Sequence, residues 1–308
     1  MASDARALPQ AGPPGRRARL RVSAAFWRWP WIKATGLLGP PVAAFLIVYV
    51  GALAALFVSS FWGVDAFTGR LVHTWSLENF RIVFSTNDPT YLRIAGRTIG
   101  IAAAVTVTDA IIAFPFAYFM ARVARSRMQA LLFALVLLPL WSSYLVRIYA
   151  WKTILAHDGA INWALNGIGL PDQNLAYTNW AMWIVFSYVW LPFMILPVYA
   201  ALERIPDSYL EASADLGARG VKTFRSVILP LVLPGLVAGS IFTFALTLGD
   251  YITPLLVGGP SSQFIGNAVY SFVGEGNIPF AAALAAIPLA IMGVYLVIAR
   301  RLGAFEAL

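Results

Sequence analysis

A polar stretch interrupts an otherwise apolar chain at residues 203–226, which read ERIPDSYLEASADLGARGVKTFRS. The segments that flank it, at about 179–202 and 227–256, are apolar and long enough to cross a lipid bilayer, which takes roughly 20 helical residues. A polar loop between two such crossings lies at a membrane surface. A soluble partner could therefore reach this loop.

The composition indicates that lipid surrounds much of the chain. Of its 308 residues, 60% are hydrophobic and only 12% are charged, whereas soluble domains carry about 25% charged residues. The 11 Trp and 12 Tyr suit the interfacial belts of a membrane protein. The net charge of +8 fits basic cytoplasmic loops better than nucleic-acid binding. The chain has no Cys, which excludes disulfides and thiolate metal sites.

Six apolar stretches predict an all-α integral membrane protein with six transmembrane helices. We place these helices at about 37–61, 97–121, 128–150, 179–202, 227–256 and 279–299. With their connections they make up a predicted membrane domain at 37–302, in which 203–226 is the polar loop.

Residues 1–36 are polar, basic and rich in Pro and Gly, which predicts a disordered tail. The apolar run that follows is longer than the roughly 7–15 residues of a signal-peptide core, so we do not expect a cleaved signal peptide.

The distribution of Lys and Arg predicts which loops face the cytoplasm. With the N-terminus inside, the inner segments receive most of the basic residues, including those at 122–127, 204–225 and 300–301. Both termini are then cytoplasmic. An odd number of crossings would place Arg300 and Arg301 outside, which favours six.

Two pairs of prolines flank the polar loop, Pro192 with Pro197 before it and Pro230 with Pro234 after it. A Pro inside a helix frees a carbonyl one turn earlier, and in lipid that carbonyl needs another partner. Any single Pro is explained as well by a kink that serves packing. Their clustering suggests bent helices next to a moving part.

A short helix is predicted within the loop, from Tyr209 to Leu216. Ser208 followed by Glu211 matches a capping box at its start, and Gly217 suits a left-handed stop at its end. Such a helix is too short to be stable alone in water, so it needs a surface or a groove to lie in. Its apolar face consists of Tyr209, Leu210, Ala212 and Leu216.

The loop resembles that of ABC importer permease subunits. Glu211 and Ala212, then Gly217, then Leu229-Pro230 fall at the spacing of that family. Ser213 stands where the family pattern has Ala, and Val227 stands where it has Ile. Segments 138–151 and 248–260 also resemble parts of the spermidine/putrescine permeases, and the whole resemblance covers about residues 40 to 300.

The resemblance implies a type I ABC importer permease fold in a bacterial cytoplasmic membrane, with the loop helix as a coupling helix in a cleft of a cytoplasmic ATPase. It further implies a second homologous permease subunit in a heterodimer, two ATPase subunits and an external substrate-binding protein, with polyamines as cargo. ATP and Mg²⁺ would be held by the ATPase, and this chain would bind no cofactor. The implied coupling residues are Tyr209, Leu210, Glu211, Ala212, Ser213, Asp215 and Gly217.

Two acidic residues within the predicted crossings are candidates for the substrate pathway, because charged groups in lipid tend to face a cavity or a partner. Asp250 beside Tyr251 suits a cation, since a carboxylate supplies charge and a ring supplies its negative face. Asp250 could instead cap a broken helix or pair with Arg147. For Asp109, a packing hydrogen bond is at least as good an interpretation as transport.

Aromatic residues near the third crossing could line the same pathway, although aromatics at span ends more often anchor a helix at the interface. They are Trp141, Tyr144, Tyr149 and Trp151. Arg147 lies among them and could repel cations or neutralise an acid on a partner subunit.

The sequence contains no recognisable chemistry of its own. There is no phosphate-binding loop of the Walker type, and His73 and His157 lack metal-ligand spacing. We therefore predict neither a catalytic residue nor a metal site. An alternative is a secondary transporter of a small organic cation driven by an ion gradient, for which the two intramembrane acids would serve. A membrane-embedded enzyme is a second alternative without an identifiable set of catalytic residues.

Overall fold

The computed structural model describes residues 30–65, 68–260 and 262–302, and the chain separates into two units at Val58 and Ser59. The first unit contains one helical stretch, formed by α2 (Pro30–Phe45), the π-helical turn η1 (Leu46–Val50) and α3 (Gly51–Ser59). Most of the predicted tail lies outside the described residues. Helix α2 nevertheless begins inside it, at Pro30.

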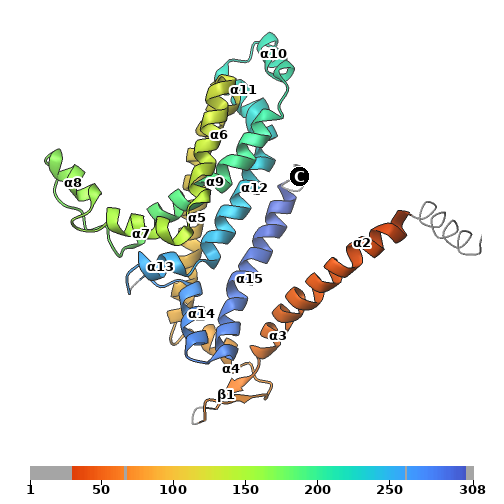
Figure 1. Ribbon diagram of the computed structural model, residues 1–308, viewed down its shortest axis with the longest axis vertical. Coiled ribbons are helices and arrows are strands. Elements are labelled where there is room, and N and C mark those ends of the chain that lie inside the picture. Colours follow the sequence, from red (N-terminus) through yellow and green to blue (C-terminus); the bar gives the residue numbers. More distant parts are fainter. Residues whose placement is uncertain (1–29, 66–67, 261, 303–308) are drawn as a thin grey trace, which may run out of the picture. The chain divides into compact units, whose positions relative to one another are not determined.

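The second unit is a bundle of helices (Figure 1). Helix α9 (Asn179–Glu203) packs against α5 (Thr90–Tyr118) and α12 (Leu229–Gly249), and α5 also packs against α12. Helix α15 (Ile278–Arg301) packs on α12 and on α14 (Ile265–Gly274). The bundle therefore has α5, α9 and α12 at its centre.

Five helical stretches are long and apolar enough to span a membrane, and a bent pair makes a sixth if it counts as one crossing. This confirms the prediction of a multi-span helical protein. The spans are Thr35–Ser59, Thr90–Val123, Asn179–Glu203, Gly220–Gly249 and Ile278–Arg301, with the bent pair at Ser126–Trp141 and Tyr144–Ile154.

The crossing predicted at 128–150 is bent, a feature that its apolar pattern did not predict. Helix α6 (Ser126–Trp141) and α7 (Tyr144–Ile154) meet at 94°, and the change of direction is visible in Figure 1. Ser142 and Ser143 adopt extended ψ angles of 151° and 134°. The Ser142 hydroxyl donates to the Pro139 carbonyl at 2.7 Å, so side-chain bonding replaces the helical ladder at the break.

The predicted crossing at 227–256 is also broken, and it begins earlier than expected. A short helix α11 (Gly220–Thr223) and a π-helical turn η3 (Phe224–Ile228) lead directly into α12. The chain is extended at Asp250 and then forms α13 (Ile252–Leu256). A second π-helical turn, η2 (Phe119–Val123), extends α5 at its end.

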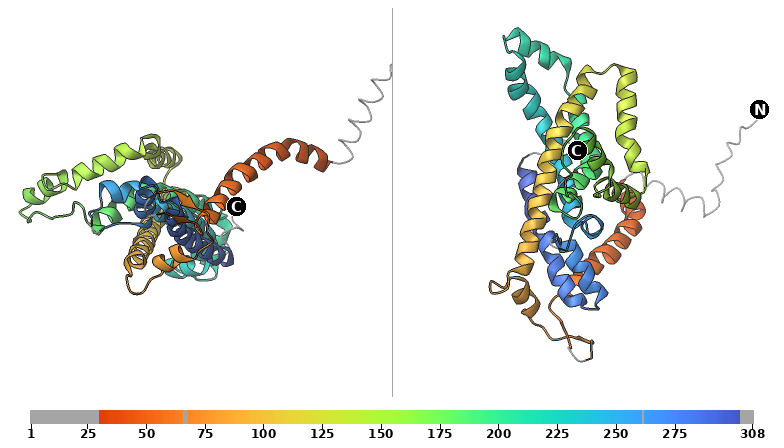
Figure 2. Two further views of the ribbon diagram at one scale, coloured as in Figure 1. Left: turned by 90° about the horizontal axis from the view of Figure 1, so that it is seen from below. Right: turned by 90° about the vertical axis from the view of Figure 1, so that its left-hand side faces the viewer.

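Two ends of the second unit differ in structure. One end carries α10 (Asp207–Asp215) and α11, and the opposite end carries α4 (Glu78–Val83) and α14 (Figure 1). A small antiparallel hairpin of β1 (Gly63–Val64) and β2 (Leu71–Val72), which the all-α prediction did not include, lies near α4. Helix α5 runs between the two ends (Figure 2, right), and α8 (Ala160–Gly167) follows α7.

Small residues bring α9 and α12 into close contact. A Cβ atom on Gly235 would lie 2.5 Å from the Ala201 Cβ, and one on Gly239 would lie 2.8 Å from the sulfur of Met194. Glycines at this spacing allow helix backbones to approach closely, which is how helices pack in lipid. The two helices that flank the polar loop are therefore packed directly against each other.

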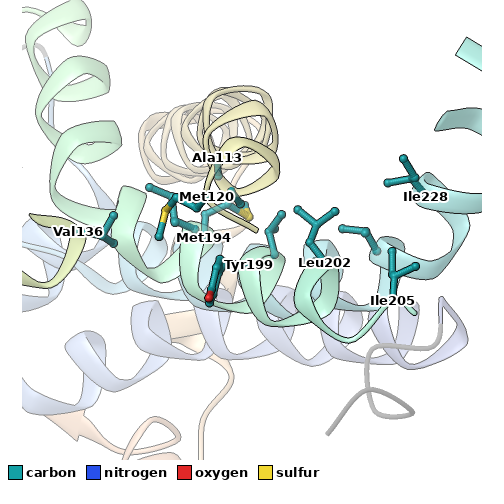
Figure 3. Close-up of a cluster of buried hydrophobic side chains, with 12 residues drawn as sticks. Ala113, Met120, Val136, Met194, Tyr199, Leu202, Ile205 and Ile228 are labelled. Atoms are coloured by element: carbon teal, nitrogen blue, oxygen red, sulfur yellow. The ribbon is translucent and has the colours of Figure 1, made fainter. Parts of the chain in front are cut away.

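A continuous apolar cluster extends along α5 and α9 to the base of α10 (Figure 3). Met120 and Met194 lie towards one side of it, and Leu202, Ile205 and Ile228 lie next to the loop. Leu210 of α10 packs against the same cluster. The short helix of the polar loop is thus joined to the core of the bundle.

Candidate functional site

The short helix α10 is present, but its start differs from the prediction. It begins at Asp207, after Pro206, and among the described residues no side chain caps its first amides. The predicted capping box of Ser208 and Glu211 is therefore wrong. Pro206, at φ −64° and ψ 142°, holds the chain extended just before the helix, so Asp207 instead of Tyr209 occupies the first helical position.

The predicted end of α10 is confirmed. Gly217 has a φ of +74°, the left-handed conformation that Gly adopts without steric cost. The amide of Gly217 donates to Ala214 O at 2.8 Å and that of Ala218 donates to Ser213 O at 3.0 Å. These bonds occupy carbonyls that the end of the helix would otherwise leave free.

One face of α10 is attached to the bundle. Ser213 is 8% exposed, and its hydroxyl lies 3.0 Å from that of Thr223 on α11. Leu210 is half-buried against the apolar cluster. At the start of α10, Asp207 pairs with Arg122 at 2.7 Å. The helix is therefore held at its start and in its middle.

The rest of α10 is exposed. Glu211 and Asp215 lie at the surface on the side of the helix away from Ser213, whereas the exposed Tyr209, Ala212 and Leu216 lie nearer to the Ser213 side. Glu211 has no ion pair within the part of the chain that the structure describes. A hollow of ≈ 410 Å³ lies beside the contact of Ser213, between α10 and the segment formed by α11 and η3. Its lining residues include Tyr209, Ala212 and Leu216. The apolar side chains of α10 therefore border this hollow, and the carboxylates of Glu211 and Asp215 lie on the side of the helix away from Ser213.

Asp250 caps the helix that follows it. Its Oδ1 accepts the amides of Ile252 at 2.7 Å and of Thr253 at 3.2 Å. Its Oδ2 accepts the Thr253 hydroxyl at 2.9 Å and also the Tyr144 hydroxyl. Of the alternatives that the sequence left open, the structure shows the capping role. Asp250 also accepts a hydrogen bond from Tyr144 of α7, which the sequence did not predict.

Aromatic side chains line a hollow of ≈ 300 Å³ beside Asp250. Tyr144 stacks on Trp190 with ring centroids 5.5 Å apart, and Tyr251 lines the same hollow. The Trp190 Nε1 is buried and has no hydrogen-bond partner among the described residues. Sequence reasoning missed Trp190, because an aromatic residue in mid-span has no pattern that separates it from ordinary packing.

The other residues predicted for the pathway lie elsewhere. Trp141 is 89% exposed at the end of α6, and Tyr149 is exposed on α7. Trp151 contacts Tyr188, with ring centroids 5.3 Å apart, and lines a different hollow. Of the four aromatics proposed around the third crossing, the structure brings only Tyr144 to Asp250.

Asp109 is completely buried in α5, and neither carboxyl oxygen has a hydrogen-bond partner among the described residues. Ser187 of α9 lies beside the carboxyl, although its hydroxyl is likewise buried and unpaired there. Asp109 does not line the hollow beside Asp250. The two intramembrane acids therefore occupy separate environments.

Arg147 forms no ion pair with Asp250 in the described structure. Its guanidinium carbon lies 5.9 Å from the centroid of the Tyr144 ring, and its Nε and one terminal nitrogen are buried without a partner. Within residues 30–65, 68–260 and 262–302, no group of three or more His, Asp or Glu side chains could hold a metal ion.

Comparison with known protein families identifies the fold. Residues 113–305 match the family described as the binding-protein-dependent transport system inner membrane component. The chain belongs to this family. The match covers the polar loop, the broken crossing at Asp250 and the central helices α9 and α12.

Curated relatives extend the similarity beyond that region. The inner membrane ABC transporter permease protein YdcU of Escherichia coli strain K12 is 46% identical over 309 residues, covering 96% of this chain and 97% of the relative. The spermidine/putrescine transport system permease protein PotB of Salmonella typhimurium strain SL1344 is 31% identical over 256 residues, covering 82% and 87%.

A solved structure shares the fold at low sequence identity. It is a bacterial alginate ABC transporter in complex with an alginate pentasaccharide-bound periplasmic protein, and one of its chains matches with a TM-score of 0.73 at 16% identity. The match covers 93% of this chain and 98% of that one. The chain is thus a permease subunit of an ABC importer with the type I fold, and a multi-pass protein of a bacterial inner membrane transport system.

Proposed function

We propose that this permease subunit imports polyamines in an ATP-driven complex. The similarity to PotB, a spermidine/putrescine permease, over 82% of this chain supports this substrate class. In this complex the subunit forms half of the translocation pore, beside a second and homologous permease subunit. An external binding protein delivers the substrate, and transport proceeds by alternating access.

The α10 end of the second unit faces the cytoplasm in this proposal. That end carries Arg125 just before α6 and Arg127 in its first turn, and Arg219, Lys222 and Arg225 around α11. Cytoplasmic loops hold such an excess of Lys and Arg. Helix α15 ends with Arg300 and Arg301, so the C-terminus belongs on the same side, and the N-terminal tail is proposed to lie there too.

The exposed face of α10 is the docking surface for the ATPase. The single observation that carries this proposal is that Glu211 and Asp215 are exposed on the side of α10 away from Ser213, while Ser213 and Leu210 attach the same helix to the bundle. A helix held on one face and free on the other can receive force and pass it to the core. ATP and Mg²⁺ are bound by the ATPase, which performs the hydrolysis.

Charge reversal at Glu211 tests the docking surface. Glu211→Lys is expected to reduce co-purification of the ATPase and to uncouple ATP hydrolysis from uptake, while the variant still inserts and pairs with the second permease. Uptake and ATPase binding equal to those of the unaltered complex would contradict the docking role.

The hollow beside Asp250 is the proposed contact for the substrate. A carboxylate and the rings of Tyr144, Trp190 and Tyr251 line it. Ammonium groups are attracted to carboxylates and to ring faces, and the apolar stem of a polyamine packs on aromatic surface. Asp250 already accepts four donors, so an ammonium group would have to replace the Tyr144 hydroxyl.

A second candidate function is suggested by Asp109. Its carboxyl is completely buried and has no hydrogen-bond partner in the described bundle, an arrangement that destabilises the fold and therefore calls for a functional explanation. Ion-driven transporters use buried carboxyl groups to bind the coupling ion. Proteoliposomes that contain the permeases without ATPase distinguish the two functions. Polyamine uptake driven by a proton gradient alone would favour this candidate, and uptake that requires ATPase and ATP would exclude it.

A further inference from the structure

One guanidinium group joins three segments at the α10 end. Arg122, in the π-helical turn η2 at the end of α5, has a side chain that is only 13% exposed. It donates to the carbonyl of Leu202 at 2.7 Å and to the carbonyl of Ile205. It also donates to Oδ1 of Asp207 at 2.7 Å.

The first two acceptors belong to the end of α9 and to the linker that follows it. The last carbonyls of a helix have no intrahelical partner, and a cation near them is favourable. Arg122 donates to Leu202 O in the last turn of α9, which also accepts the Ile205 amide at 3.3 Å, and to Ile205 O one residue before Pro206. The direction in which the chain leaves α9 is therefore set by a side chain from α5.

The third acceptor belongs to α10. Asp207 is the first residue of α10, where a carboxylate is also favoured by the helix dipole. Arg carries its N–H donors in a rigid planar fork, so a single guanidinium can hold acceptors that lie in different directions. The angle between α9 and α10 is thus defined by Arg122 and by the two segments that it joins.

We propose that Arg122 is a positioning residue for ATPase coupling, which holds α10 at a fixed angle and passes its displacement to α5. This inference rests on the proposed docking of the ATPase on α10. Helix α5 packs on α9 and α12. At its other end Thr98 accepts the amide of Ile265 at 3.2 Å, so α5 joins the α10 end to the α14 end.

Asp207 gives the sharpest test because its side chain is 83% exposed. Exposed ion pairs contribute little to stability, so Asp207→Asn is expected to fold and assemble normally. Removing Arg122 would take its donors from the Ile205 carbonyl and from the Leu202 carbonyl, which then keeps only backbone amide donors. Arg122→Lys, which keeps the charge but not the fork, is therefore the milder variant. Arg127→Gln is the matched control, because Arg127 is exposed and forms no ion pair in the described structure.

The experiment uses the full importer in proteoliposomes, with radiolabelled putrescine and the binding protein outside. We measure ATPase co-purification, ATP hydrolysis and putrescine uptake per ATP hydrolysed. Asp207→Asn and Arg122→Lys are expected to keep the ATPase bound but to lower uptake per ATP about fivefold, the change that corresponds to about 1 kcal/mol. Asp207→Glu should restore the ratio, and Arg127→Gln should leave it unchanged.

The Glu211→Lys variant, measured in parallel, separates this inference from the docking proposal. If Glu211→Lys disrupts coupling while Asp207→Asn and Arg122→Lys do not, the positioning role is overturned and docking on α10 stands. If Asp207→Asn releases the ATPase as Glu211→Lys does, Asp207 belongs to the docking surface, and the positioning role is overturned as well. If all three variants remain coupled, both proposals fail.

Discussion

The hydroxyl of Ser213 on α10 lies 3.0 Å from the hydroxyl of Thr223 on α11. Ser213 stands where the motif that the loop resembles has Ala, a side chain that could not form this bond. It connects the two short helices of the polar loop across the turn that contains Gly217. The bond therefore holds α10 against α11 with one side-chain contact that Ala at position 213 could not make.

Ser213→Ala tests the contribution of this bond. It removes a partly buried hydrogen bond, worth about 1 kcal/mol, without altering the exposed face of α10. We expect faster amide hydrogen exchange across residues 208–223 and normal ATPase binding. Ser208→Ala is the control, because Ser208 is exposed and no cap bond from it is present in the described helix. Equal effects of the two changes would contradict the role of Ser213.

Asp250→Asn separates capping from substrate contact when it is compared with Thr253→Val. Thr253→Val removes one hydroxyl that bonds Asp250 and leaves the carboxylate charge in place. If the charge contacts a polyamine, Asp250→Asn should lower putrescine uptake about tenfold more than Thr253→Val at equal amounts of assembled complex. Losses of uptake that merely follow losses of assembly, in both variants, would assign Asp250 to capping alone.

Gly235→Val should disrupt the packing of α9 on α12. The added Cβ would lie 2.5 Å from the Ala201 Cβ and 2.7 Å from the Pro197 carbonyl oxygen, so the helices would have to separate. Overpacking of this kind costs typically about 1–3 kcal/mol. We expect a lower melting temperature in detergent and less assembled complex. Gly100→Val is the control, since its added Cβ would meet no atom within 4 Å beyond the adjacent residues and the nearby backbone of its own helix, and a comparable loss there would refute the packing argument.

Single cysteines can determine the orientation, because the chain contains no native Cys. Ser208→Cys lies on the exposed surface of α10, and Asn166→Cys lies on the exposed surface of α8. An impermeant maleimide applied to intact cells should label Asn166→Cys at once and Ser208→Cys only after permeabilisation. The reverse pattern would place α10 outside and would remove the basis for ATPase docking.

Local signals in the sequence predicted part of the loop correctly. Gly217 was expected to end the helix because Gly adopts the left-handed conformation without a steric cost, and its φ of +74° confirms this. The start was predicted wrongly. Ser208 and Glu211 match a capping pattern, but the preceding Pro206 and the pairing of Asp207 with a distant Arg place the start two residues earlier, at Asp207 instead of Tyr209.

The breaks within the crossings are also features that local sequence patterns did not predict. Hydropathy predicted apolar segments at 128–150 and 227–256, and apolar helices are found at both. Hydropathy averaged over the length of a crossing does not reveal a change of direction. The helices end at Ser142 and at Asp250, but one polar residue hardly changes the average of a segment that is otherwise apolar. The 94° bend between α6 and α7 therefore follows from local hydrogen bonding that average hydropathy does not register.

The amino-acid sequence alone determined that this protein is helical and lies in a membrane, where its polar loop falls and which family motif the loop carries. These properties depend on composition and on residues that are close in sequence. Only the tertiary structure decided that Tyr144 meets Asp250 across 106 positions and that Arg122 meets Asp207 across 85. Such contacts depend on how each helix is rotated and packed against its neighbours. Several rotations satisfy the same apolar pattern, and close packing with paired polar groups selects one of them.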